Sequence, residues 1–258
     1  MSAPAATRTA SWYPSEGLLQ RGTVVLLPGR GEHPGVYERL GRRLSADAYV
    51  VHVLDGAPSL DLDRSVADLA QVGQGSAAPL VLAGSDTGAL RALAVAADPS
   101  VHLDGLLLVG TPLGTDAGST DTGSTDTLSI DEWQGELAAR TACPAHRGRL
   151  EADSGFVRGA LDTPAPEELS AAAEAAVPLL GALPVLLVHG EADAVAPVAG
   201  ATALAARLPR SVLVTVADGR HDAINDLSHR SVAAAVVQWL ERLRAGAHLP
   251  VVVTVREK

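Results

Sequence analysis

The sequence predicts an α/β fold with a mostly parallel, doubly wound sheet, and three observations favour it. Six short runs are almost continuously Val and Leu, as expected for strands buried on both faces of a parallel sheet. Longer stretches with helical periodicity separate these runs. The chain has 258 residues, of which 47% are hydrophobic and 19% charged. That composition allows one large domain with a sizeable core and excludes global disorder.

The predicted elements alternate along the chain. The strands are Thr23–Leu27, Tyr49–Leu54, Leu80–Ala83, Leu106–Val109, Val185–Val188 and Val212–Val216. The helices between and after them are Gly35–Ala46, Leu62–Gln74, Thr87–Ala97, Val198–Leu208 and Leu227–Arg244. Near the N-terminus, Thr7–Tyr13 and Glu16–Gln20 are expected to add an antiparallel edge. The β-prone run Val251–Val255 predicts a last strand, either on its own sheet edge or across a homodimer.

Residues 115–183 interrupt this alternation, because they contain no convincing strand. They open on the pentapeptide GSTDT, which occurs at Gly118–Thr122 and again at Gly123–Thr127. Such a short polar tandem is typical of a flexible loop. Helices are predicted near Ile130–Arg140 and Pro166–Ala176. We therefore expect a core formed by residues 1–114 and 184–258, and a flexible loop plus helical cap over residues 115–183.

Composition narrows the possible partners. The net charge of −10 disfavours nucleic acid and anionic membranes. Cys143 is the only cysteine, so no internal disulfide forms, and no Cys/His cluster suggests a metal. The first ten residues lack the pattern of a signal peptide, and the apolar run 176–188 is short and contains two prolines. We expect a cytoplasmic protein that acts on a small molecule without a cofactor or metal.

A strand–turn–helix pattern indicates where the chemistry lies. The predicted strand at Leu80 runs into the turn Gly84-Ser85-Asp86-Thr87-Gly88, and a helix follows at once. This is the context of a nucleophile elbow, in which two glycines flank a residue thrown out above the sheet. The middle residue is Asp86, and the spacing places Ser85 one position too early. Alone, such a turn would also fit a simple helix N-cap.

Two further segments strengthen that interpretation. A strand is followed by a turn with Asp193, and the next strand by a loop with His221. In an open parallel sheet, sites form at the carboxyl ends of the strands. Asp86, Asp193 and His221 are therefore expected to converge, in the chain order nucleophile, acid, histidine.

With these motifs, nearly the full chain resembles the α/β-hydrolase fold family. Residues 26–31 (LLPGRG) are similar to the family's oxyanion loop, with Pro28 where histidine is common. Residues 189–197 (HGEADAVAP) are similar to its acid loop, and residues 219–222 (GRHD) to its histidine loop. Aspartate at the elbow, where serine is usual, resembles the epoxide hydrolase and haloalkane dehalogenase branch.

The resemblance implies a role for each residue. Asp86 would be the nucleophile, His221 the base and Asp193 the acid that orients it. The backbone N–H groups of Arg30 and Thr87 would form the oxyanion hole. Further candidate pocket residues are Gly29, Ser85 and Trp133. A carboxylate attacks sp³ carbon and would leave an alkyl ester on its own side chain, which water activated by the histidine would then hydrolyse.

The low aromatic content, 3%, complicates the choice of substrate. Similar dehalogenases often carry Trp after the nucleophile, where this chain has Thr87. Epoxide hydrolases of this fold use cap tyrosines, and residues 115–183 contain no Tyr. Trp133 could reach a leaving group, although burial of one ring of an amphipathic helix explains it as well. Tyr37 is expected to be ordinary helix packing.

The predicted function is a cofactor-independent hydrolase with a covalent Asp86 intermediate, acting on a small or mid-sized uncharged electrophile such as an epoxide or halide. One alternative is a carboxylic-ester or lactone hydrolase in which His221 activates water directly. Another is a non-hydrolytic lyase, isomerase or cyclase step with Asp86 in proton transfer. The last is a catalytically inactive binding module, which the presence of both Asp193 and His221 disfavours.

Overall fold

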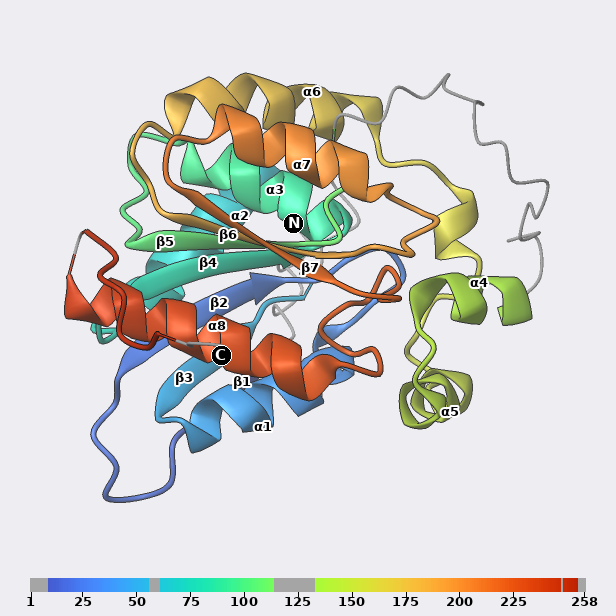
Figure 1. Cartoon of the computed structure of the whole chain (residues 1–258), viewed down its shortest axis with the longest axis horizontal. Coiled ribbons are helices and arrows are strands. Elements are labelled where there is room, and N and C mark those ends of the chain that lie inside the picture. Colours follow the sequence, from blue (N-terminus) through green and yellow to red (C-terminus); the bar gives the residue numbers. More distant parts are fainter. Residues whose placement is uncertain (1–8, 56–60, 114–132, 247, 255–258) are drawn as a thin grey trace, which may run out of the picture.

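A seven-stranded sheet organises the computed structural model, which describes residues 9–55, 61–113, 133–246 and 248–254 (Figure 1). The spatial order is β1-β3-β2-β4-β5-β6-β7. Strand β1 is antiparallel to β3, and the other neighbours are parallel. The strands are β1 Ala10–Trp12, β2 Gly22–Leu27, β3 Tyr49–Val53, β4 Leu80–Ser85, β5 Gly105–Val109, β6 Val185–Gly190 and β7 Ser211–Val216. The predicted fold class is confirmed.

Helices cover both faces of the sheet, as a doubly wound fold requires. Helices α1 and α8 lie on one face, and α2, α3, α6 and α7 lie on the other (Figure 1). The helices are α1 Glu38–Ala46, α2 Leu62–Gly73, α3 Thr87–Ala96, α4 Trp133–Arg140, α5 Pro144–Ala152, α6 Glu167–Ala176, α7 Val198–Arg207 and α8 His229–Ala245. Short 3₁₀ helices occur at Pro34–Tyr37, Ala160–Asp162 and Val177–Leu179.

Two apolar clusters, one on each face, form the core. The first joins the sheet to α1 and α8 through residues such as Leu40, Val236 and Trp239. The second joins it to α2, α3, α6 and α7 through residues such as Leu69 and Leu90. Central strands β2, β5 and β6 are buried along their whole length, which explains their unbroken runs of Val and Leu.

Between β5 and β6 the described chain forms helices α4, α5 and α6, in the stretch for which a helical cap is predicted. The tandem GSTDT loop lies outside the described residues. Helices α4 and α5 lie beyond the end of the sheet to which β2 points, whereas α6 packs against α3 over the sheet (Figure 1). The sequence analysis did not anticipate α5. Its first residue is Pro144, which suits the first turn of a helix because no N–H is needed there.

Two edge predictions need correction. The segment Glu16–Gln20 is not a strand: it contains a turn, and the Leu19 side chain is 87% exposed. The described part of the C-terminal run, residues 251–254, is exposed and unpaired with the sheet, which contradicts the sheet-edge alternative, while pairing across a homodimer stays a prediction. β-Branched residues form a strand only where a neighbour supplies backbone partners. Here Arg242 instead holds the Leu249 carbonyl against α8.

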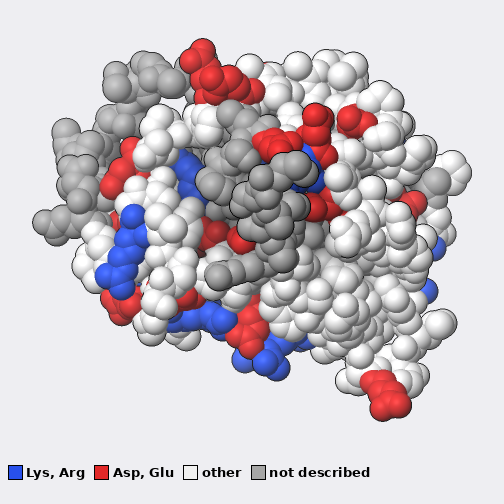
Figure 2. Space-filling view, turned by 180° about the vertical axis from the view of Figure 1, so that it is seen from behind, with Lys and Arg blue, Asp and Glu red and all other residues white. Residues whose placement is uncertain are grey.

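Charges on the described surface are mixed. Basic and acidic side chains lie next to one another at several places on the face seen in Figure 2. Arg42 and Glu38 on α1, for example, form an ion pair at 2.8 Å. Across the described ranges, no helix combines the length and apolar character needed to cross a bilayer.

Candidate active site

The turn after β4 has the geometry of a nucleophile elbow. Asp86 has φ 51° and ψ −124°, a backbone conformation that L-residues rarely adopt. A Cβ on Gly84 would lie 2.2 Å from the Gly88 carbonyl oxygen, and a Cβ on Gly88 would lie 2.1 Å from the Leu27 carbonyl oxygen. Both glycines are therefore required for β4, α3 and the loop after β2 to approach one another.

The three predicted residues converge at the carboxyl ends of the strands. His221 Nδ1 lies 2.8 Å from Asp193 Oδ2, and His221 Nε2 lies 3.3 Å from Asp86 Oδ1. The other oxygen of Asp193 accepts the N–H groups of Val195 and Ala196, each at 2.9 Å. The acid is thus fixed by its own turn and orients the histidine toward Asp86.

The electrostatics of the row formed by Asp86, His221 and Asp193 favour the charged form of each group. Burial disfavours a charged imidazole, but Asp193 and then Asp86 outweigh it and raise the pKa of His221 to about 10. Burial also opposes ionisation of Asp86, yet hydrogen bonds with His221 and Arg30 hold the pKa of that carboxyl well below its usual range. At neutral pH the row is carboxylate, imidazolium, carboxylate.

Arg30 contacts Asp86 with both its backbone and its side chain. The Arg30 N–H donates to Asp86 Oδ2 at 2.9 Å, as expected of an oxyanion-hole donor. In addition, Nε donates to Oδ2 at 2.8 Å and Nη2 to Oδ1 at 2.7 Å. The third guanidinium nitrogen, Nη1, donates to the Thr163 carbonyl at 2.6 Å. From the sequence, Arg30 is expected to act through its backbone N–H, with an anionic substrate as the alternative partner of its guanidinium, and this fork-like clamp on Asp86 is not anticipated.

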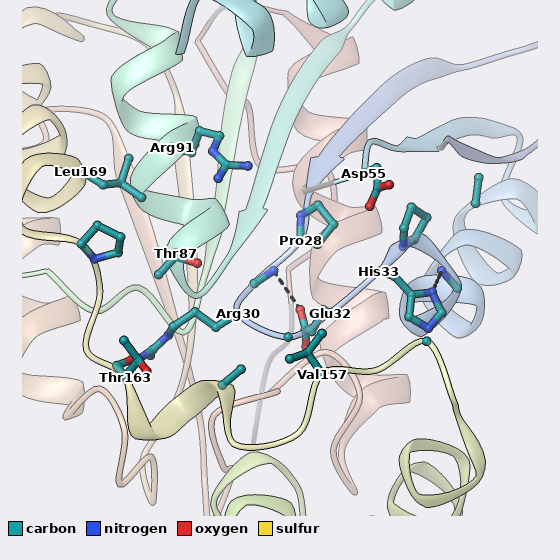
Figure 3. Close-up of a pocket in the computed structure, with 18 of the residues that line it drawn as sticks. Pro28, Arg30, Glu32, His33, Asp55, Thr87, Arg91, Val157, Thr163 and Leu169 are labelled. Atoms are coloured by element: carbon teal, nitrogen blue, oxygen red, sulfur yellow. Dashed lines mark hydrogen bonds between the residues drawn. The ribbon is translucent and has the colours of Figure 1, made fainter. Parts of the chain in front are cut away.

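A pocket of about 810 Å³ opens in front of this clamp. Figure 3 shows Arg30 and Thr163 on one side and Pro28, Asp55 and His33 on the other. The described lining residues are Thr9, Ala10, Pro28, Gly29, Arg30, Gly31, Glu32, His33, Pro34, Gly35, Asp55, Thr87, Arg91, Gly155, Val157, Ala160, Thr163, Pro164, Pro166 and Leu169. Neither Asp86 nor His221 is among them, and their exposed fractions are 2% and 1%.

The structure places some of the predicted pocket residues in the pocket lining and leaves others out of it. Gly29, Arg30 and Thr87 line the pocket, and Thr87 begins α3, where the first N–H groups lack helical partners. Ser85 is buried at the end of β4 and is not among the described lining residues. Trp133 is not among them either.

Two aromatic residues of interest serve in packing. Trp133 stacks at a tilt on Phe156, with ring centroids 5.6 Å apart, and the Arg158 guanidinium lies 4.7 Å from its centroid. Tyr37 is buried, and its hydroxyl contacts Glu32 and accepts the Gly29 N–H at 3.2 Å. The Trp133 ring thus contacts other side chains of the cap region, whereas the Tyr37 hydroxyl has polar contacts with two pocket-lining residues that ordinary helix packing did not predict.

A buried ionic network centred on Arg140 supports the site. Arg140, at the end of α4, donates to Glu136 at 2.9 Å and lies 3.5 Å from Glu32 and 3.7 Å from Asp222. Its Nη2 also donates to the Arg30 carbonyl at 2.7 Å. The network therefore joins α4, the loop after β2 and the loop after β7. The spacing of Glu136 and Arg140, four residues apart on a predicted helix, was its only sequence signal.

Glu32 is the member of this network that reaches the pocket. One of its oxygens accepts the Gly29 N–H at 2.9 Å and the Tyr37 hydroxyl. Burial, followed by the nearby charge of Asp222, raises the pKa of Glu32 to about 7. Asp222 faces Arg140 and His146 in this network, so the acid that orients His221 is Asp193.

Within the described part of the chain, no group of three or more His, Cys, Asp or Glu side chains is arranged to hold a metal ion.

Comparisons with known proteins agree with this fold. The model of a family described as TAP-like protein matches residues 162–248, which include Asp193 and His221. No curated protein sequence matches the chain. The chain is similar to the monoacylglycerol lipase of Paleococcus ferrophilus (TM-score 0.68, 18% identity, 92% of this chain and 99% of that one). It is also similar to a soluble variant of the Saccharomyces cerevisiae monoglyceride lipase (0.70, 17%, 94% of each chain). A third similar structure is a putative non-heme bromoperoxidase of Mycobacterium tuberculosis (0.65, 17%, 92% and 96%). Together with the sheet order and the elbow, these likenesses establish that the chain has the α/β-hydrolase fold.

Proposed function

We propose that the protein is a cofactor-independent hydrolase in which Asp86 is the nucleophile, His221 the base and Asp193 its orienting acid. One observation carries the proposal. In the elbow, Asp86 Oδ2 accepts the backbone N–H of Arg30, while Oδ1 lies 3.3 Å from His221 Nε2. The two oxygens thus have different surroundings, which suits a carboxylate that attacks through one oxygen and keeps the other in an oxyanion hole.

The reaction would proceed in two steps. Oδ1 of Asp86 forms a bond to an electrophilic carbon, the leaving group departs with its electron pair, and an alkyl ester remains. Water then attacks the Cγ atom of that ester. Its proton goes to His221, and the Arg30 N–H stabilises the oxyanion on Oδ2. The Cγ–Oδ1 bond then breaks, and the departing oxygen takes that proton back from His221 to leave as an alcohol. The new oxygen on Asp86 comes from water.

The protonation of His221 is compatible with this order. In the resting site two carboxylates raise the pKa of its imidazole to about 10, so it is charged and cannot act as a base. Formation of the ester removes the charge of Asp86, one of those two carboxylates. The imidazole pKa then falls, and the base becomes available when the second step needs it.

Arg30 supplies the electrophilic assistance that the aromatic residues do not. Its guanidinium must leave Oδ1 before this oxygen can attack, since Nη2 now donates to it at 2.7 Å. Once released, the guanidinium is a donor beside the reacting atoms and can stabilise a departing alkoxide or halide. The substrate would be a small or mid-sized electrophile that fits the pocket of about 810 Å³.

The same clamp favours one second candidate, hydrolysis of a carboxylic ester or lactone. A carboxylate with two guanidinium bonds and a strongly lowered pKa is a weak nucleophile. In this version the Asp86–Arg30 pair stays intact and His221 activates water directly, which requires it first to lose the proton that its raised pKa holds at neutral pH, so this activity should rise with pH toward about 10. The names of two similar structures, both monoacylglycerol or monoglyceride lipases, are in line with an ester substrate.

Isotope labelling separates the two candidates. The enzyme is allowed a single turnover of styrene oxide, 1-chlorobutane or p-nitrophenyl acetate in water enriched in ¹⁸O, and the Asp86 peptide is analysed by mass spectrometry. The covalent route predicts ¹⁸O in the Asp86 carboxylate, and His221→Gln should accumulate the alkyl-enzyme as a mass increase. Turnover of the acetate without label in Asp86 would support the second candidate. No turnover of these probes or of 4-chlorobutanoate, the carboxylate-bearing analogue of 1-chlorobutane, would argue against both.

A further inference from the structure

Arg30 separates the pocket from the proposed catalytic residues. It is among the residues that line the pocket, whereas neither Asp86 nor His221 is among the described ones. The Arg30 side chain is 13% exposed, and that of Asp86 is 2% exposed. A ligand entering the pocket therefore meets the guanidinium of Arg30 before it meets the carboxylate of Asp86.

The bonds between these two side chains are of a type that another carboxylate can reproduce. A guanidinium presents parallel N–H donors that match the two oxygens of a carboxylate. Arg30 uses Nε and Nη2 in this way on Asp86, at 2.8 and 2.7 Å. If the side chain turned away, Asp86 Oδ2 would keep the backbone N–H of Arg30, at 2.9 Å, so part of its solvation would remain.

We propose that Arg30 is the anion-binding residue of the pocket, and that the ligand is a carboxylate which replaces Asp86 on its guanidinium. The inference refines the proposed function and rests on it, because releasing Asp86 matters for catalysis only if Asp86 is the nucleophile. It changes the expected substrate from an uncharged electrophile to one that carries a carboxylate. Binding of that group would free Oδ1 for attack, so that the substrate itself unmasks the nucleophile. The guanidinium would then hold this carboxylate in place of assisting the leaving group.

The rest of the pocket suits a carboxylate with an apolar body. Arg91 lies on α3 one turn beyond Thr87, on the same wall of the pocket (Figure 3). Two other ionisable groups of the lining already have partners: His33 pairs with Asp153 at 2.8 Å, and Glu32 accepts the Gly29 N–H. Asp55 lies on the side of the pocket opposite Arg30 (Figure 3). Apolar lining comes from four prolines and from Val157, Ala160 and Leu169.

Calorimetric titration with hexanoate and with its neutral analogue hexanamide tests the inference without any turnover. Asp86 is the internal competitor, so its removal should strengthen hexanoate binding. Asp86→Asn removes only the charge. Asp86→Ser is a second variant with a residue that suits an elbow, and circular dichroism confirms that each variant is folded. Arg30→Gln removes the proposed site. Arg91→Gln is the matched control, since it removes another arginine of the same pocket.

The expected results follow from charge-assisted hydrogen bonding. Asp86→Asn and Asp86→Ser should bind hexanoate at least about tenfold more tightly than the wild type, with no such gain for hexanamide. The gain should persist when Arg91→Gln is added and disappear when Arg30→Gln is added. The proposal is overturned if folded Asp86 variants show no gain, if hexanamide gains equally, or if the gain survives without Arg30. None of these results depends on catalysis, so failure here is distinct from failure of the labelling experiment.

Discussion

Replacing Arg140 with methionine tests whether the buried ionic network holds the site together. The Arg140 side chain is completely buried, and it is the cation that faces Glu136, Glu32 and Asp222 at 2.9, 3.5 and 3.7 Å. Methionine retains much of the side-chain length and removes the charge. The variant therefore leaves three buried carboxylates without this cation, and it also removes the donor to the Arg30 carbonyl.

The expected loss is large compared with the stability of a domain. Breaking a buried ion pair by removing one partner costs about 3–5 kcal/mol. Whole domains unfold with about 5–15 kcal/mol, so Arg140→Met should lose a third or more of a typical value. Urea denaturation at pH 7.5, followed by circular dichroism, measures the difference as a shift in the midpoint.

The pH dependence of that loss identifies its electrostatic origin. A carboxyl whose folded-state pKa is raised binds more protons when folded, so it favours folding as the pH falls. For wild-type Glu32 this window lies between the ordinary pKa of a glutamate side chain, 4.5, and about 7. Without Arg140, whose charge lowers the pKa of Glu32, this carboxyl is still easier to protonate. The penalty of Arg140→Met should therefore be smaller at pH 5 than at pH 8.

A surface arginine provides the matched control. Arg207 pairs with Glu174 at 2.7 Å, and their side chains are 44% and 41% exposed. Exposed pairs contribute about 0–1 kcal/mol, so Arg207→Met should change the stability by no more than that. The reasoning fails if Arg140→Met costs as little as Arg207→Met, or if its cost is the same at pH 5 and pH 8.

Two further predictions concern the elbow and the histidine. Gly88→Ala should prevent correct folding, because the new Cβ would lie 2.1 Å from the Leu27 carbonyl oxygen. Gly148→Ala, whose Cβ has no atom within 4 Å, should instead raise the free energy of unfolding by about 0.5–1 kcal/mol. Soluble yield and thermal melting compare the two variants. NMR titration should find His221 protonated up to about pH 10, with a lower pKa in Asp86→Asn. Because the pKa of His221 is raised from 6.5, its interaction with the two carboxylates contributes fully to stability below pH 6.5, and this contribution is lost as the pH rises through about 10. A wild-type His221 that titrates near 6.5 would contradict the geometry.

The sequence was informative wherever the backbone alone decides the outcome. Buried parallel strands need continuous apolar runs, so β2, β5 and β6 could be recognised from residues such as Leu106 and Val185. The elbow could be recognised because only glycine tolerates the close approach at positions 84 and 88. Since Asp193 and His221 follow strand ends, their convergence with Asp86 is a consequence of topology.

Side-chain direction was the part that the sequence could not determine. The position of Arg30 in the oxyanion loop predicts its backbone N–H, but a long flexible side chain can point to solvent, to a substrate or back to Asp86. Its direction depends on the Thr163 carbonyl, which is distant in sequence. The same holds for Arg140, whose carboxylate partners at 32 and 222 come from separate loops. For Val251–Val255, local β propensity predicted a strand without regard to whether a sheet edge lies within reach.

The charge balance links the proposed reaction to the proposed ligand. In the resting site Asp86 and Asp193 offset His221 and Arg30, so the buried row of four groups is neutral. Forming the alkyl ester would remove the charge of Asp86 and leave an excess of positive charge, which is costly in a buried site. A substrate carboxylate held by Arg30 would supply the missing negative charge at that stage. With this carboxylate near Arg30 and Asp193 still beside the imidazole, His221 would lose only one neighbouring anion, Asp86, and its pKa would fall toward the range in which it can take a proton from water. A ligand without the carboxylate would have to separate Arg30 from Asp86 with nothing to replace that bond. We therefore expect a neutral electrophile to react far more slowly than its carboxylate-bearing analogue.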